Sequence, residues 1–174
     1  MAVLFLNYNL DMRIDKTTID WLLLPKALPS STHFQNPRTW MGKENWDIVR
    51  KEVYKRANNV CEVCGGKGRR HPVEAHELWA FNLETKEQIL IRFVALCPLC
   101  HRLQHMGLAG IHNKSKLLNG SELARHYNKL TGSQINFDEL YEMGMAIYEK
   151  ISGGEYKVIL DKHDEPLLKL WKQD

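Results

Sequence analysis

Four cysteines occur in this sequence as two pairs of identical spacing, Cys61/Cys64 and Cys97/Cys100, with 32 residues between the pairs. A C-x2-C pair on a tight turn directs both sulfurs at one ion, and two such pairs complete a tetrahedron of thiolates. Because a closed tetrahedron leaves no position for water, we predict a structural zinc ion here. The alternative is that the four thiols are reduced and buried without a metal.

Three histidines form a second candidate metal site. His101 and His105 are four residues apart on an expected helix, which places both imidazoles over the same spot. His76 interrupts an otherwise strand-like run. Three neutral imidazoles that meet at one point leave positions open for water and a phosphate oxygen, as in a catalytic divalent-metal site. The alternative is an ordinary pair of surface histidines.

The elements that must position these side chains follow one another as helix, strand, strand and helix. Apolar residues at helical spacing predict the first helix, which leads directly into Cys61. Pro98 is tolerated in the first turn of the last helix. Around the cysteines we expect a helix at 43–58, strands at 73–81 and 87–96, a helix at 98–106 and a basic loop at 107–120.

The rest of the chain contains further expected elements. Ser121 and Asn136 are the expected N-caps of two helices, and Glu139 occupies the capping-box position of the second. These elements are a strand at 2–8, a helix or strand at 17–24, a proline-rich connector at 25–39, helices at 121–131 and 137–152, and a hairpin of 156–160 with 167–171, where the second segment is alternatively a helical turn. We therefore expect an α+β protein with three parts: an N-terminal extension (1–40), a zinc module (41–112) and a C-terminal helical extension (113–174).

Composition favours a soluble protein of the cytoplasm. The apolar opening AVLFL is too short for a signal peptide, and WLLLP at 21–25 is far below the ~20 residues of a membrane span. We expect thiols to stay reduced in that compartment, where paired cysteines favour a metal over disulfides.

Charge is distributed unevenly along the 174 residues, although the formal net charge is only +3. Residues 38–70 carry nine basic and four acidic side chains, which suits a polyanionic partner such as nucleic acid. Residues 133–174 carry five lysines and nine carboxylates, a candidate docking surface for a larger protein partner. The alternative for both is a plain solvated surface. The candidate phosphate-binding residues are Arg50, Lys51, Lys55, Arg56, Arg69 and Arg70.

The motifs CEVCGG, VEAHELW and VALCPLCHRLQH together resemble the four-cysteine branch of the HNH endonucleases, over roughly residues 43–107. The resemblance implies a ββα-metal (treble-clef) fold and hydrolysis of nucleic acid, DNA more often than RNA. It also implies His76, His101 and His105 as ligands of one divalent ion. This chain departs from the family at two positions: Glu77 stands where the general-base histidine is usual, and Arg92 where an asparagine usually orients that base.

We therefore expect a metal-dependent endonuclease that uses Mg²⁺, Mn²⁺, Ni²⁺ or Zn²⁺ at the histidines, besides the structural zinc. Glu77 would activate water, and Arg92 would brace Glu77 or neutralise a phosphate oxygen. The alternative is a catalytically silent zinc module that binds nucleic acid or a protein partner. Such a module would tolerate Glu77 and would not need the three histidines.

Overall fold

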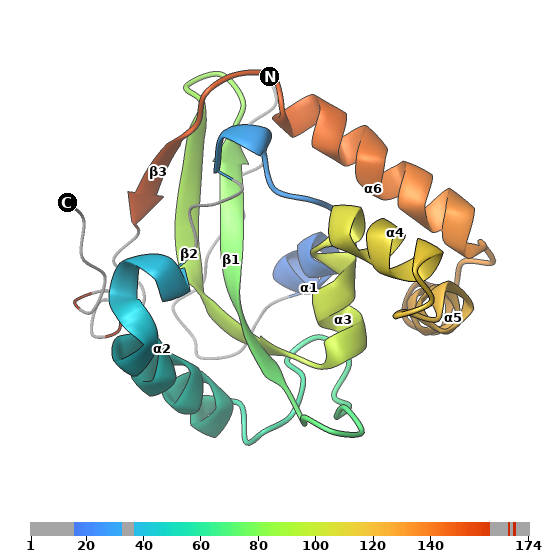
Figure 1. Cartoon of the computed structure of the whole chain (residues 1–174), viewed down its shortest axis with the longest axis horizontal. Coiled ribbons are helices and arrows are strands. Elements are labelled where there is room, and N and C mark those ends of the chain that lie inside the picture. The colour runs from blue at the N-terminus through green and yellow to red at the C-terminus, as the bar shows by residue number, and fades with distance from the viewer. Residues whose placement is uncertain (1–15, 33–36, 161–166, 168, 170–174) are drawn as a thin grey trace.

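A computed structural model describes residues 16–32, 37–160, 167 and 169 and shows an α+β fold, as the sequence predicts (Figure 1). A small sheet lies at the centre, with α2 on one side of it and most of the other helices on the other. In chain order the elements are α1 (Lys16–Leu23), a 3-10 turn (Ser30–Thr32), α2 (Pro37–Arg56), β1 (Glu74–Asn82), β2 (Glu87–Leu96), α3 (Pro98–Leu103), α4 (Met106–Lys114), α5 (Gly120–Thr131), α6 (Phe137–Ile151) and β3 (Lys157–Leu160).

The sheet is built on an antiparallel hairpin of β1 and β2. Pairing begins with Glu74 opposite Leu96 and continues to the turn, with an irregularity between Leu78 and Trp79. In the turn, the side-chain oxygen of Asn82 accepts hydrogen bonds from two backbone N–H groups, which stabilises the chain reversal. The two predicted strands are therefore confirmed to within one residue at their ends.

The third strand, β3, pairs parallel with the first half of β2, so the strand order is β1-β2-β3 and β1 is an edge of the sheet as described. Its position agrees with the strand predicted at 156–160. The predicted partner at 167–171 falls almost entirely outside the described residues, as does the strand predicted at 2–8. The hairpin and the first strand therefore stay predictions.

The hairpin leads directly into α3, which gives the expected order of strand, strand and helix. Cys97 is the N-cap of α3, and Pro98 is its first residue, where a missing N–H costs little. The helix predicted at 98–106 is too long, because α3 ends at Leu103 and Gln104 forms its C-cap. A separate helix, α4, begins two residues later.

The basic loop predicted at 107–120 is wrong, because α4 occupies most of that range. Two glycines in the segment disfavour a helix locally. Tertiary packing overrides this preference: Met106 and Ala109 are fully buried, and Gly110 lets the Tyr141 ring of α6 approach so closely that a Cβ would lie 2.4 Å from it. The helix is formed by its contacts with α6 rather than by its own sequence.

The ends of the two C-terminal helices agree with prediction in one case and differ in the other. The capping box of α6 is confirmed, with Asn136 and Glu139 each bonding the other's backbone. The predicted N-cap of α5 at Ser121 is wrong. Asn119 is the N-cap, because its side-chain oxygen accepts a hydrogen bond from the N–H of Glu122.

The helix predicted at 43–58 is longer at its start and shorter at its end. α2 begins at Pro37 but is interrupted at Gly42, whose φ of 76° is a left-handed conformation that glycine adopts without strain. Asn58 and Asn59 are also left-handed, with φ of 53° and 55°. They end the helix and turn the chain toward the first cysteine pair.

The hydrophobic core crosses both predicted domain boundaries. Val49 and Val53 of α2 pack with the hairpin, and Trp21 of α1 joins the same cluster and donates its indole N–H to the Trp79 carbonyl at 2.8 Å. Ile151, at the end of α6, packs there as well. A second cluster lies among α3, α4, α5 and α6. The boundaries at 41 and 113 stay a prediction, but residues from all three parts share one core.

Replacing Gly68 with Ala should destabilise the loop between the first cysteine pair and β1. A Cβ at this position would lie 2.1 Å from the His71 carbonyl oxygen and 2.5 Å from Pro98, and backbone cannot move aside cheaply. We expect a loss of about 1–3 kcal/mol in the free energy of unfolding, measured with urea. Gly107→Ala is the control, because nothing lies within 4 Å of its added methyl. Equal stability of the two variants would contradict the packing described here.

Candidate metal centres

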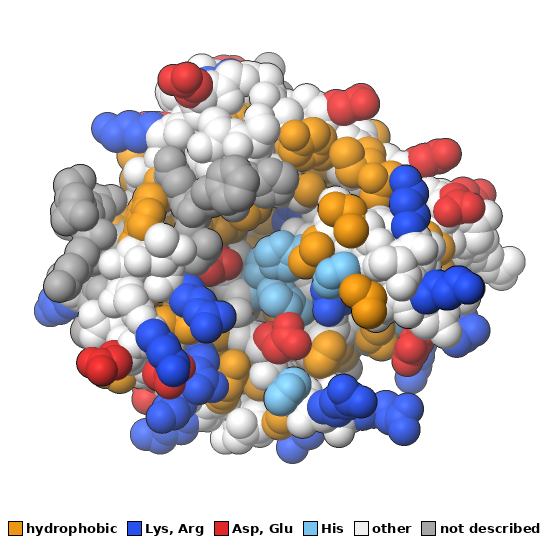
Figure 2. Space-filling view, viewed as in Figure 1, with side chains coloured by type: hydrophobic (Ala, Val, Ile, Leu, Met, Phe, Trp, Pro, Cys, Tyr) orange, Lys and Arg blue, Asp and Glu red, His pale blue; other side chains and the backbone are white. Residues whose placement is uncertain are grey.

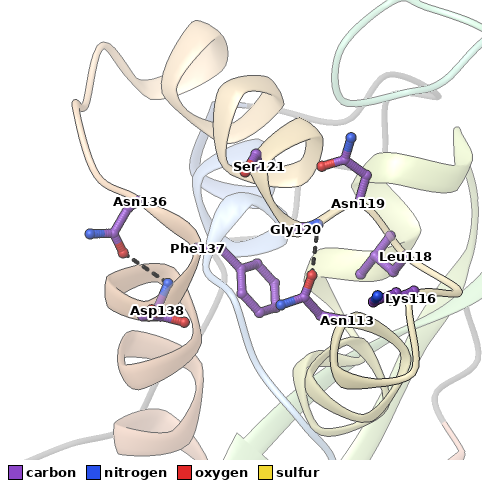
Figure 3. Close-up of a pocket in the computed structure, with 9 residues that line it drawn as sticks. All are labelled: Asn113, Lys116, Leu118, Asn119, Gly120, Ser121, Asn136, Phe137 and Asp138. Carbon is purple, nitrogen blue, oxygen red and sulfur yellow. Dashed lines mark hydrogen bonds between the residues drawn. The ribbon is translucent and has the colours of Figure 1, made fainter.

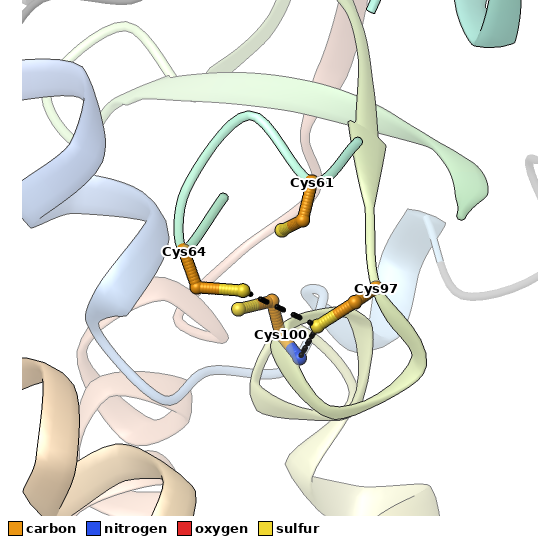
Figure 4. Close-up of side chains that lie close together, drawn as sticks. All are labelled: Cys61, Cys64, Cys97 and Cys100. Atoms are coloured by element: carbon orange, nitrogen blue, oxygen red, sulfur yellow. Dashed lines mark hydrogen bonds between the residues drawn. The ribbon is translucent and has the colours of Figure 1, made fainter. Parts of the chain in front are cut away.

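The four cysteine sulfurs converge on one point from three elements (Figure 4). All four atoms lie within 4.8 Å of one another, and the Sγ atoms of Cys64 and Cys97 are 3.6 Å apart. Sulfurs bound at ~2.3 Å to one tetrahedral ion lie about 3.8 Å apart. The predicted four-cysteine group is therefore positioned to hold a metal ion.

Local backbone structure explains why each pair points inward. In the first pair, the N–H of Cys61 donates to the Gly66 carbonyl and the N–H of Gly65 donates back to Cys61, both at 2.9 Å. Gly65 has a φ of 68°, so the tight turn requires a residue that tolerates this conformation. In the second pair, Cys97 and Cys100 lie on the first turn of α3, where the Cys100 N–H donates to the Cys97 sulfur at 3.5 Å.

The thiols are packed closely enough to stabilise thiolates. Hydrogen bonds from Cys100, the largest of several effects, lower the pKa of the Cys61 thiol to about 7 and also lower that of Cys64. The hydrogen bond to Cys61 in turn raises the pKa of the Cys100 thiol. Thiolate is the form that binds a metal, so this packing favours the binding form at Cys61 and Cys64 and disfavours it at Cys97 and Cys100.

Arg92 belongs to this centre and not to the histidine site. Its guanidinium pairs with Glu62 at 2.9 Å, and the second oxygen of that carboxylate accepts from the Ala95 N–H at 2.6 Å. Both charged side chains are largely buried, at 8% and 14% exposed. Arg56 donates to the Phe93 carbonyl. β3 pairs only with residues 87–90 of β2, so these bonds satisfy the rest of β2 on the side away from β1 and fasten it to the first cysteine pair.

The three histidines form the second cluster, as the sequence predicts. One ring nitrogen from each of His76, His101 and His105 lies within 4.8 Å of those from the other two. The Nε2 atoms of His101 and His105 are 3.1 Å apart. Nitrogens bound at ~2.1 Å to one ion lie about 3.0–3.4 Å apart, so this pair already has the spacing of two ligands.

The prediction that His101 and His105 lie on one helix is wrong. The two residues do not share a helix, because α3 ends at Leu103 and His105 is the N-cap of α4. Lys26 fixes the break between these helices. Its N–H donates to the Leu103 carbonyl at 2.8 Å, and its carbonyl accepts from Met106 at 2.9 Å. The connector at 25–39 therefore places His105, a role that nothing in its composition indicated.

Two further residues near the histidines were missed. Glu74 binds Nδ1 of His101, and this hydrogen bond is the main cause that lowers the pKa of its carboxyl. Glu74 lies two residues before His76 and therefore on the same face of β1, a period-2 signal that was available in the sequence. The side chain of Lys26 is buried, donates to the Trp21 carbonyl and has its pKa lowered to about 7 by burial.

His76 is the buried member of the cluster, at 4% exposed. Burial, followed by the charges of His101 and His105, lowers its pKa well below the ordinary value, so its imidazole is neutral. Its Nδ1 is buried and has no hydrogen-bond partner among the described residues. An orphaned buried nitrogen is costly, which is a condition that a bound ligand relieves.

Glu77 follows His76 on β1, and strand alternation alone would direct the two side chains to opposite faces. One of its carboxylate oxygens nevertheless lies 3.8 Å from Nδ1 of His76, and its side chain is only 15% exposed. Burial raises the pKa of the Glu77 carboxyl. A carboxylate with a raised pKa, close to a candidate metal site, has the properties of a general base.

The six candidate phosphate-binding residues divide into two groups. Arg50 pairs with Asp47 at 2.7 Å, and Arg56 is held by the β2 backbone as described above. The other four are exposed: Lys51, Lys55, Arg69 and Arg70. Figure 2 shows histidines gathered in a hollow near the centre of one face, with Lys and Arg side chains concentrated where α2 lies.

A separate pocket of about 540 Å³ lies between the starts of α5 and α6 (Figure 3). Asn119 and Asn136 cap the two helices, and Asn113 accepts from the Gly120 N–H at 3.0 Å. Four backbone donors at the two helix starts are thus already engaged by the protein, those of Gly120, Glu122, Asp138 and Glu139. We assign no ligand to this pocket.

Comparison with protein-family models, curated proteins and solved structures finds no match to this chain. Among the described residues, no helix combines the length and the apolar character needed to cross a membrane. Function is therefore inferred from the two side-chain clusters.

Replacing Cys97 with Ser should remove the metal ion and unfold the central module. A structural zinc contributes on the order of 10 kcal/mol of folding free energy in small modules, so the variant should be insoluble or strongly destabilised. Metal content and thermal unfolding of the purified protein measure this, with Ser121→Ala as an exposed control. A well-folded, metal-free Cys97→Ser protein would rule out a structural metal at this centre.

Proposed function

We propose that this chain is a metal-dependent nuclease of the HNH type, with a structural zinc on the four cysteines and a catalytic divalent ion on the three histidines. The observation that carries the proposal is the pairing of a closed four-sulfur cluster with an open three-imidazole cluster on consecutive residues, Cys100 and His101. Closed clusters are structural, whereas three protein ligands leave positions for substrate.

The donor set suits such an ion. His76 is neutral, and Glu74 holds Nδ1 of His101 so that its Nε2 faces His105. A carboxylate behind a ligating imidazole fixes its tautomer and raises its basicity. When bound, the ion would polarise the scissile phosphate and stabilise the leaving oxygen. Imidazole ligands favour the later transition metals, and Mg²⁺ or Mn²⁺ remain candidates for the chemistry.

The side chains around the cluster would take the other parts of the reaction. Glu77 would remove a proton from the attacking water, since burial moves the pKa of its carboxyl toward neutral pH. Lys51 and Lys55 on α2, with Arg69 and Arg70 in the loop before β1, would hold flanking phosphates. β1 is an edge strand of the described sheet, so its free edge is open to a substrate. A phosphodiester bound at this edge would reach both Glu77 and the histidines.

One observation favours a second function, a silent zinc module that binds nucleic acid or a protein. Arg92, which was expected to brace the base, instead pairs with Glu62 beside the cysteines. The two positions that depart from the HNH pattern therefore do not support each other. In this alternative the basic α2 face remains a binding surface, and Glu77 has no chemical role.

The nuclease is tested by separating loss of the metal from loss of the base. His105→Ala should abolish both the second metal and cleavage, while the zinc on the cysteines is retained. Glu77→Gln should retain both metals and substrate binding but slow cleavage by roughly 10²–10⁴-fold. Cleavage of DNA and RNA would be assayed with Mg²⁺, Mn²⁺, Ni²⁺ and Zn²⁺, and metal content measured on the same samples.

Two controls accompany these variants. His112→Ala removes a histidine of α4 that lies outside the cluster, and Glu84→Gln removes a carboxylate from the exposed hairpin turn. Both should behave as wild type. Unchanged cleavage in Glu77→Gln would remove Glu77 from the mechanism. A wild-type protein that cleaves no nucleic acid with any of the four metals would favour the silent module.

Glu74 should control the affinity of the histidine site without changing its ligands. Glu74→Ala removes the carboxylate that orients His101, and loss of such a partner costs about 10–100-fold in metal affinity. Titration of Ni²⁺ or Zn²⁺ into protein whose cysteine site is already filled measures this directly. Glu84→Gln serves again as the matched control. Equal affinities in Glu74→Ala and wild type would mean that His101 is positioned by the backbone alone.

A further inference from the structure

His126 of α5 lies against the cysteine cluster. Its Nε2 atom is 3.2 Å from the Cys100 sulfur, although the two residues are 26 positions apart in the sequence. Cys100 is completely buried and His126 is half-buried.

The electrostatics of the cluster create a need for such a donor. Four thiolates around one dication carry a net charge of −2, and three of these cysteines are buried. Buried anionic sulfur is stabilised by N–H donors, because water is excluded. Backbone N–H groups meet this need at Cys64, from Gly66 at 3.4 Å, and at Cys97, from Cys100 at 3.5 Å. At Cys100 the contacting group is the imidazole of His126.

We propose that His126 is a functional part of the metal centre: in the metal-loaded protein its Nε2–H donates a hydrogen bond to the Cys100 thiolate. His126 is a positioning residue in this role and not a fifth ligand. The group whose donor atoms all lie within 4.8 Å of one another consists of the four cysteines and does not contain His126. The neutral tautomer with its proton on Nε2 is sufficient.

This bond joins the C-terminal helices to the centre. Cys100 precedes His101 directly, so His126 contacts the ligand next to the histidine cluster along α3. α5 also packs on α3 through Leu123 and Leu103 in the same hydrophobic cluster. The proposal concerns retention of the ion on the cysteines and is independent of nuclease activity.

Two substitutions separate the hydrogen bond from simple packing. His126→Leu fills similar space but has no donor, whereas His126→Gln carries an N–H₂ group that reaches the position of Nε2. We expect His126→Leu to lose the metal to a chelator such as EDTA on the order of tenfold faster than wild type. His126→Gln should restore much of the difference. Arg125→Ala, an exposed neighbour on the same helix, is the control and should match wild type.

Cobalt substitution gives the second measurement. Co²⁺ in the cysteine site should give the absorption of four sulfur ligands in wild type and in both His126 variants, because the ligand set does not change. A spectrum of three sulfurs and one nitrogen in wild type would make His126 a ligand and overturn the proposal. Equal rates of metal loss in His126→Leu and wild type would also overturn it. Rates that rise equally in His126→Leu and His126→Gln would assign the effect to packing.

Discussion

The convergence of four sulfurs on one point is the constraint on which the rest of the structure depends. It joins the loop after α2 to the junction of β2 and α3, two segments more than thirty residues apart in the sequence that the chain connection alone does not hold together. Around it lies a second set of bonds: the Glu62–Arg92 pair, the Arg56 contact with β2 and the His126 contact with Cys100. Each of these three contacts holds a different element against the region of the cysteine cluster.

The two clusters differ in the way that structural and reactive centres differ. Three of the four cysteines are buried and their sulfurs face one another, so the interior of that group has no room for a substrate. The three histidines differ in exposure: His76 is buried, whereas His101 and His105 are half-buried and partly accessible from the surface. The rigid cysteine centre lies directly beside the histidines, so it fixes their geometry while leaving them accessible to a substrate.

Local sequence signals predicted the parts of the site that depend on spacing. The C-x2-C pairs, the two strands and the capping box of α6 are determined by residues within a few positions of one another, and each is present. The missed features depend on distant partners. Lys26 breaks the helix before His105 from nearly eighty residues away, α4 forms because α6 covers it, and Arg92 finds Glu62 across the fold. A bulge between Leu78 and Trp79 further shifts which residues of β2 face those of β1, and residue counting cannot foresee that shift.

The main-chain hydrogen bonds of Lys26 determine whether the histidine site could be transferred to another scaffold. The strand, strand and helix unit looks self-contained, but the third histidine is placed by hydrogen bonds to a residue that precedes it in the N-terminal part of the chain. Gln104 makes a similar contact, donating to the carbonyl of Leu22. Grafting the cysteines and the three histidines onto another scaffold would therefore leave His105 without its support and the sulfur cluster without His126. The N-terminal part contributes main-chain groups to these bonds, so the support of His105 depends on the path of this part of the chain and not on the side chains it carries.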